Sequence, residues 1–111
     1  MKNLDNKTWE KAQKEDDNSV ILDVRTPEEY EEKHIPKSKL INVQESQNFV
    51  DEIQKLDKSK SYYVYCRSGG RSAMAANIME QMGFEDVSNL EGGITDWHGE
   101  IDSWFGNVPI A

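Results

Sequence analysis

The chain has 111 residues, 36% of them apolar, and its 21 acidic and 13 basic side chains leave a net charge of −8. This is the length of one domain with its own core, and the acidic balance argues against nucleic acid or an anionic membrane as partner. The longest aliphatic run, Val20 to Leu22, is too short to span a membrane, and the N-terminus carries no apolar signal segment. We therefore expect one soluble, cytoplasmic domain over residues 1–111, acting as a monomer.

The first elements are a polar helix and a buried strand. Lys7 to Lys14 predicts a short helix, and Val20 to Val24 is an apolar run typical of a buried strand. A second helix follows, because Thr26 is a capping residue, Pro27 suits the first helical position, and Glu29 completes a capping box. The acidic run of this helix is interpreted as a solvated face.

The middle of the chain alternates again between strand and helix. Leu40 to Val43 predicts a second strand, and Ser46 is the expected cap of the next helix. Tyr62 to Tyr65 is rich in aromatic and branched residues, which favours a central strand. The apolar stripe of the intervening helix consists of Phe49, Val50, Ile53 and Leu56.

The last elements continue the pattern. Another helix is expected before Gly83, which would end it as a C-terminal cap, and Asp86 to Leu90 predicts a short strand. Ile94 to His98 predicts a final helical turn. The helical stripe before Gly83 consists of Ala75, Ile78, Met79 and Met82. Regular alternation of strands and helices predicts an α/β fold, with a mostly parallel central sheet and helices on both faces.

Cys66 is the only cysteine, so no internal disulfide can form. Together with two distant histidines it makes a poor zinc site, and we expect no metal and no cofactor. A lone cysteine is most often a small buried hydrophobic residue. Its neighbours decide whether that interpretation holds here.

Cys66 follows a predicted central strand, at the edge of a parallel sheet where binding sites form. Gly69 and Gly70 can adopt positive φ, which lets successive backbone amides turn toward one point above the next helix. Arg67 and Arg71 add two cations in an otherwise acidic chain. Such surroundings lower a thiol pKa from about 8.5 to about 3.5–7.5, which favours a nucleophilic thiolate.

Three segments resemble the motifs of rhodanese-type sulfurtransferases, and they occur in the family's order. The segment from Cys66 to Ser72 resembles the active-site loop, Leu22 to Tyr30 followed by His34 to Pro36 resembles an earlier motif, and Leu90 to Ile94 with Trp97 resembles a later one. The motifs lie within about residues 19–100 and leave a C-terminal tail over 101–111.

The resemblance implies the rhodanese-like fold and a covalent sulfur-carrier mechanism. Cys66 would be catalytic and take the outer sulfur of a donor such as thiosulfate as a persulfide, then pass it to cyanide or a thiol, without metal or cofactor. The donor would be a small sulfur-containing anion or a persulfide, and the acceptor could be a protein thiol. Arg67 and Arg71 would attract the donor, and Arg71 would also brace the loop. The substrate-binding loop implied by the resemblance comprises Arg67, Ser68, Gly69, Gly70, Arg71 and Ser72.

Alternative functions remain for the same loop and fold. Protein tyrosine phosphatases, including relatives of this fold, place five residues between cysteine and arginine, whereas four separate Cys66 from Arg71. The shorter loop makes a smaller ring of amides, which disfavours phosphatase or arsenate reductase chemistry. A persulfide carrier with little thiosulfate turnover, or a non-catalytic interaction module, is also compatible with the fold.

Several further residues have a structural and a functional interpretation. Asp23 and Arg25 follow a buried strand, and structural hydrogen bonds are favoured over a place in the site. His34 and His98 are assigned surface or capping roles, and Trp97 is assigned to the core.

The sequence departs from the family pattern where Lys33 and Lys37 replace the usual glycines. We give these replacements little weight, because both lie far from Cys66 in sequence. Trp104 and Phe105, in the tail, either pack over the domain or border an interface with a donor protein, and the sequence does not decide between these roles.

Overall fold

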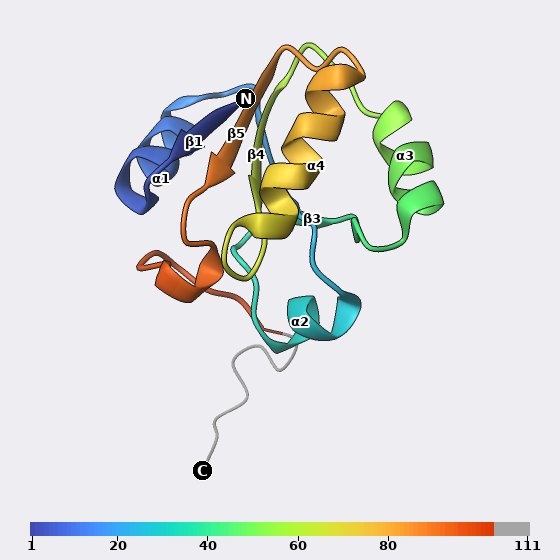
Figure 1. The fold of residues 1–111 in the computed structure, drawn as a ribbon. Coiled ribbons are helices and arrows are strands. Elements are labelled where there is room, and N and C mark those ends of the chain that lie inside the picture. Colours follow the sequence, from blue (N-terminus) through green and yellow to red (C-terminus); the bar gives the residue numbers. More distant parts are fainter. Residues whose placement is uncertain (104–111) are drawn as a thin grey trace.

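The computed structural model describes residues 1–103, which form one parallel sheet with helices around it (Figure 1). The strand order across the sheet is β1-β5-β4-β2-β3, and every neighbouring pair is parallel. The five strands are β1 (Lys2–Leu4), β2 (Ser19–Asp23), β3 (Lys39–Leu40), β4 (Ser61–Tyr65) and β5 (Asp86–Leu90).

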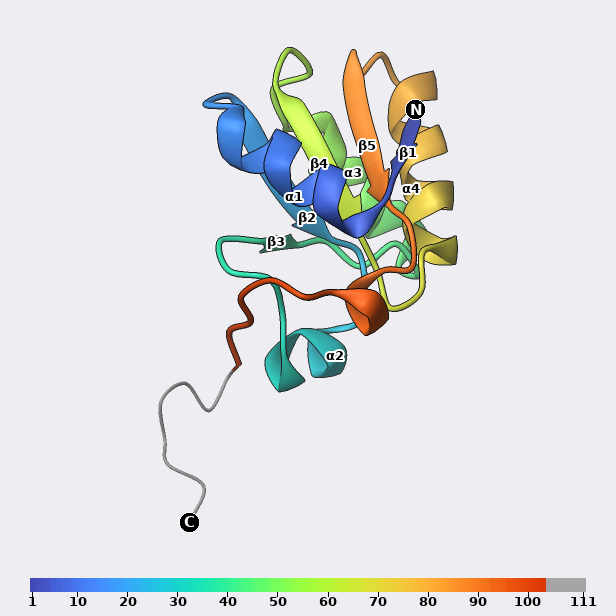
Figure 2. The ribbon, with the colours of Figure 1, turned by 90° about the vertical axis from the view of Figure 1, so that its left-hand side faces the viewer.

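Helices cover both faces of the sheet, which confirms the predicted α/β class. Figure 2 shows α1 in front of the sheet, with α3 and α4 behind it. The short α2 lies beyond the carboxyl ends of the strands (Figure 1). The helical elements are α1 (Asn6–Glu15), α2 (Pro27–Glu32), α3 (Ser46–Gln54), α4 (Gly70–Gln81) and the 3-10 turn η1 (Ile94–Asp96).

The central strand β4 divides the core into two clusters. Tyr62 and Val64 face the cluster covered by α3 and α4, and Cys66, directly after the strand, belongs to the same cluster. Tyr63 and Tyr65 face the opposite cluster, where Trp9 of α1 packs. Because side chains alternate along a strand, this register turns the Cys66 side chain toward α4 and away from α1.

The sequence analysis missed one strand and misplaced the bounds of another. The polar segment Lys2–Leu4, which was not predicted as a strand, forms edge strand β1 by pairing with β5. The predicted strand over 40–43 is only Lys39–Leu40, although the amides of Ile41 and Val43 still donate to the carbonyls of Asp23 and Val24 at the end of β2. Both differences depend on pairing with a distant strand, which a local apolar pattern does not report.

The helix ends test the predicted caps. The capping box at Thr26 is confirmed, with Pro27 at the start of α2. Gly83 ends α4 in a left-handed conformation, with φ of +98°. Ser46 was the expected cap of α3 and is instead its first helical residue, because Glu45 occupies the capping position without a side-chain hydrogen bond.

The segment after η1 returns to the end of the molecule that carries α2. His34 and Asp102 form an antiparallel bridge, with backbone hydrogen bonds of 2.7 and 2.8 Å. Trp104 and Phe105, whose role the sequence left open, lie outside the described residues. Over residues 1–103, no helix has the length and apolarity needed to cross a membrane.

Candidate active site

Cys66 lies at the carboxyl end of β4, where the chain turns into α4. Its side chain is almost fully buried, with 1% exposed. Gly69 adopts φ of +109° and occupies the capping position of α4, as expected for a glycine that turns the backbone. Gly70 is not among the positive-φ residues and is already helical, so only one of the two expected left-handed glycines is present.

Two hydrogen-bond donors of its own loop lie within reach of the Cys66 sulfur. The amide of Gly69 donates at 3.1 Å and the hydroxyl of Ser72 lies at 3.3 Å. Burial raises the pKa of the thiol, but the hydrogen bonds from Ser72, Gly69 and Ser68 outweigh burial and leave that pKa below its ordinary value. The loop therefore stabilises negative charge on this sulfur, as the sequence predicted.

A second turn, after β5, holds the start of the loop. The amides of Ile94 and Thr95 donate to the carbonyls of Cys66 and Arg67, each at 3.0 Å. Gly93 has φ of +59°, and a Cβ atom there would collide with the same two carbonyls. The later motif thus supports the Cys66 loop by direct backbone contact, which requires glycine at position 93.

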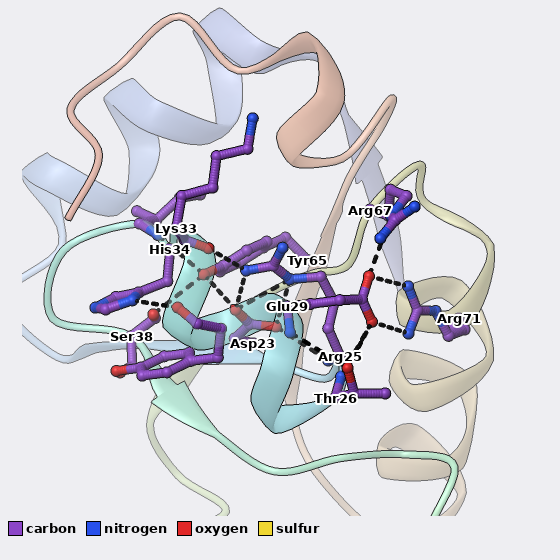
Figure 3. Close-up of polar contacts among 12 residues, drawn as sticks. Asp23, Arg25, Thr26, Glu29, Lys33, His34, Ser38, Tyr65, Arg67 and Arg71 are labelled. Carbon is purple, nitrogen blue, oxygen red and sulfur yellow. Dashed lines mark hydrogen bonds and ion pairs between the residues drawn. The ribbon is translucent and has the colours of Figure 1, made fainter. Parts of the chain in front are cut away.

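Glu29 of α2 binds both arginines of the loop (Figure 3). Its carboxylate pairs with Arg71 at 2.8 and 2.9 Å and with Nε of Arg67 at 3.1 Å. The hydrogen bonds from Arg71 hold the pKa of Glu29 at about 2. The prediction of a solvated acidic face was therefore wrong for Glu29, which lies largely buried between the cap of α2 and the loop.

The two arginines differ in their exposure and in the number of hydrogen bonds that they donate to Glu29. Arg71, with 24% of its side chain exposed, makes two bonds to Glu29 and ties α4 to α2. Arg67 makes one such bond and is 65% exposed. It borders a hollow of about 380 Å³ beside the loop, which is lined by Arg25, Glu29, Glu32, Lys33, Arg67, Ile94 and Thr95.

Asp23 and Arg25 form a separate buried cluster at the same edge of the sheet (Figure 3). Their side chains pair at 2.7 Å, and the guanidinium also donates to the carbonyl of Lys33 at 2.7 Å. The Tyr65 hydroxyl donates to Asp23 at 2.8 Å, and burial together with this carboxylate raises the pKa of Tyr65. The structural assignment of Asp23 and Arg25 agrees with these contacts, although Arg25 also lines the hollow.

The two histidines and Trp97 make their contacts with residues other than Cys66. His34 stacks on Tyr30 and its Nδ1 lies 2.8 Å from the Tyr30 carbonyl. His98 is exposed, with its amide near Asn6. Trp97 packs edge-on against Trp9 at 5.5 Å, as its core assignment predicts. Within residues 1–103, no three metal-ligating acidic, histidine or cysteine side chains gather.

Sequence reasoning missed three residues that hold the loop. Thr95 donates its hydroxyl to the Arg67 carbonyl at 2.8 Å, and Asn89 of β5 donates to the Gly69 carbonyl at 3.3 Å. Glu29 was recognised only as a capping residue. The sequence signal for Thr95 was its position just after the paired glycines, whereas nothing local distinguishes Asn89 from any other polar strand residue.

Comparison with known proteins finds relatives along most of the chain. The model of the rhodanese-like domain family matches residues 6–100. Thiosulfate sulfurtransferase GlpE of Coxiella burnetii is 36% identical over 89 residues, which cover 80% of this chain and 78% of that protein. The crystal structure of a rhodanese-like domain protein from Staphylococcus aureus superposes with a TM-score of 0.77 at 33% identity, over 90% of this chain and 94% of that one.

Other relatives are much longer than this chain. The adenylyltransferase and sulfurtransferase UBA4 of Debaryomyces hansenii is 38% identical over 95 residues, but these cover 78% of this chain and only 21% of that protein. The chain spans between 21% and 45% of the length of three curated relatives that it matches. This chain therefore matches only one part of each of these three proteins.

Proposed function

The chain belongs to the rhodanese-like domain family, and from that premise we propose that it transfers sulfane sulfur through a persulfide on Cys66. Relatives named as sulfurtransferases support a sulfur-transfer role. The observation that carries the proposal is the buried Cys66 sulfur, which accepts the Gly69 amide at 3.1 Å inside a loop that favours its anion. A thiolate held in this way is a nucleophile that needs no separate base.

In the first step, the Cys66 thiolate attacks the outer sulfur of a donor such as thiosulfate. A sulfur–sulfur bond forms to Cys66, the bond within the donor breaks, and sulfite leaves with the electron pair. The product is a Cys66 persulfide whose terminal sulfur carries the negative charge. Amides of the loop that already face the Cys66 sulfur are positioned to stabilise this anion.

In the second step, cyanide or a thiolate acceptor attacks the terminal sulfur. The acceptor takes that sulfur, and Cys66 leaves as the thiolate, so the reaction needs no metal and no organic cofactor. Arg67 is the group we assign to attract the anionic donor, because most of its side chain is exposed beside the hollow. Arg71 holds the loop through Glu29.

Phosphatase or arsenate reductase chemistry would use the same cysteine differently. The attacked centre would be tetrahedral, with several oxygens that need amide donors around a wider ring. The loop here has four residues between Cys66 and Arg71, and its amide of Gly69 already points at the sulfur. This geometry favours one additional sulfur atom over a complete oxyanion.

The test compares the wild-type protein with Cys66→Ser. We expect thiocyanate formation from thiosulfate and cyanide in the wild type and none above background in the variant. Intact-mass spectrometry should find one added sulfur on the wild type after incubation with thiosulfate, and that mass should disappear when cyanide is added.

Three results would point elsewhere. Equal turnover by wild type and variant would exclude catalysis by Cys66. Added sulfur with negligible thiocyanate formation would indicate a carrier rather than a thiosulfate-using enzyme. Strong Cys66-dependent hydrolysis of an aryl phosphate would favour the phosphatase alternative. Thermal unfolding of Cys66→Ser controls for its fold.

A further inference from the structure

The Ser72 hydroxyl has one proton and three acceptors within reach. Its oxygen lies 3.3 Å from the Cys66 sulfur, 3.2 Å from the Gly69 carbonyl and 2.5 Å from Oδ1 of Asn89. Ser72 is fully buried and Asn89 is 3% exposed, so water does not share these contacts freely. A hydroxyl donates to one strong acceptor at a time, so these groups compete for its proton.

The orientation of the Asn89 amide follows from its other neighbours. One end of the amide lies 3.3 Å from the Gly69 carbonyl and 2.9 Å from the Asn3 side-chain oxygen. A backbone carbonyl can only accept, so the atom facing Gly69 must be the Asn89 nitrogen. The Asn89 oxygen then faces Ser72, and two oxygens at 2.5 Å require a proton between them.

We propose that Asn89 is a positioning residue that competes with the Cys66 sulfur for the Ser72 proton. When Cys66 is a thiol, its S–H can donate to the Ser72 oxygen while Ser72 donates to Asn89. When Cys66 is a thiolate, its sulfur becomes a stronger acceptor for the Ser72 hydroxyl. If the hydroxyl donates to the sulfur, the buried Asn89 oxygen loses its hydrogen bond from Ser72. The inference rests on the proposed function only in taking Cys66 as the nucleophile.

The competition has a chemical consequence for sulfur transfer. A hydrogen bond from Ser72 stabilises the thiolate, but a thiolate that is stabilised too strongly attacks sulfur more slowly. By holding the Ser72 proton, Asn89 keeps the Cys66 thiolate less stabilised and therefore more nucleophilic. Asn89 thus acts through Ser72: it lowers the fraction of Cys66 present as thiolate and raises the nucleophilicity of that thiolate.

The charged surroundings of the sulfur are the same with and without Asn89. Arg71 of α4 carries the cation whose charge interacts with Cys66, and Glu29 of α2 pairs with it. All these side chains remain in the variants below, so differences between variants report the Ser72 contact. Around the loop, Glu29 pairs with Arg67 and Arg71, and Asp23, Arg25 and Tyr65 form the neighbouring buried cluster.

The experiment titrates Cys66 through the ultraviolet absorbance of its thiolate, with Cys66→Ser as the blank. Cys66 is the only cysteine, so the signal belongs to one group. In Asn89→Ala, we expect the thiolate fraction below the titration midpoint to rise about three- to tenfold, the size of one freed hydrogen bond. In Ser72→Ala it should fall by a similar factor, and the double variant should behave as Ser72→Ala does.

The double variant decides whether Asn89 acts through Ser72. If Asn89→Ala lowers the thiolate fraction, or shifts it equally with and without Ser72, the proposal is wrong. Asn3→Ala removes a neighbour of Asn89 without touching Ser72 and should leave the titration unchanged. If Asn89→Ala fails to fold in a thermal melt, Asn89→Leu, which keeps the branched shape of the side chain without its polar atoms, is measured in the same way. The titration needs no sulfur donor, so its outcome is independent of whether the proposed transfer activity is found.

Discussion

Two arginine–carboxylate groups lie at the carboxyl edge of the same sheet and differ in exposure. In the pair at the end of β2, Asp23 is fully buried and Arg25 is 3% exposed. In the group around the Cys66 loop, Glu29 is shared between Arg71 and Arg67, and Arg67 is 65% exposed. An arginine–carboxylate pair therefore lies once inside the core and once at the surface beside the Cys66 loop.

The difference in exposure decides what each of the two arginine–carboxylate groups can do. The Arg25 guanidinium donates its hydrogen bonds to the Asp23 carboxylate and to the Lys33 carbonyl, and both acceptors are held in place by the surrounding chain. This charge holds the chain around α2 and cannot leave its partner without a large cost. Arg67 makes one contact to a carboxylate that Arg71 also holds, so it can turn to an incoming anion while Glu29 stays paired.

The largest effect is expected from breaking the buried pair. Arg25→Ala leaves the Asp23 carboxylate buried without its cation, which should reduce the free energy of unfolding by about 3–5 kcal/mol. Urea denaturation measures this loss. The double variant Asp23→Leu with Arg25→Met removes both charges and should recover much of the loss. If the free energy of unfolding of Arg25→Ala lies within about 1 kcal/mol of the wild-type value, the pair does not stabilise the fold.

A smaller effect is expected from neutralising the shared carboxylate. Glu29→Gln keeps a capping side chain for α2 but loses the ionic contacts with Arg71 and Arg67, and we expect a loss of about 1–2 kcal/mol near neutral pH. Because Arg71 lowers the Glu29 pKa to about 2 from an ordinary 4.5, this stabilisation is present above pH 4.5 and is lost as the pH falls toward 2.

Denaturation of wild type and Glu29→Gln across that pH range checks the sign of the effect. The difference in unfolding free energy should be largest above pH 4.5 and should shrink as Glu29 takes up its proton. A difference that stays constant down to pH 2 would mean that the carboxylate charge contributes nothing. Glu28→Gln, on the exposed side of the same helix turn, is the matched control and should change little.

The smallest effect on stability is expected at Arg67. Arg67→Ala removes an exposed contact and should change the unfolding free energy by less than about 0.5 kcal/mol. If Arg67 attracts the donor, KM for thiosulfate should rise about fivefold with kcat nearly unchanged. Steady-state kinetics with thiosulfate and cyanide separates the two constants. A large fall in kcat at constant KM would assign Arg67 to the chemical step instead.

Local patterns predicted the elements that carry their own signals. The run Val20 to Val24 and the aromatic strand before Cys66 were recognised from apolar and branched residues, and the box at Thr26 from its spacing. β1 was missed, because Lys2–Leu4 has no apolar pattern and forms a strand only by pairing with β5. Elements whose stability comes from a distant partner leave no local trace.

The candidate site divides in the same way. The loop from Cys66 to Ser72 was predicted because its cysteine, arginines and glycines lie within seven consecutive residues. Glu29 was interpreted as solvated, since an acidic helix face is usually exposed, and only the packing of α2 against the loop brings it to the arginines. Asn89 was missed because its contacts to Gly69 and Ser72 cross from β5 to α4.

The sequence by itself determined the alternating α/β architecture, the position of the single cysteine after a central strand and the turn from that strand into a helix. These features depend on residues that are neighbours along the chain, so their physics is local. The tertiary structure alone decided which arginine is mostly exposed beside the hollow, which carboxylate pairs with the loop arginines and which side chain competes for the Ser72 proton. Hydrogen bonds and ion pairs depend on distances of about 3 Å between atoms, and for these residues only folding sets those distances.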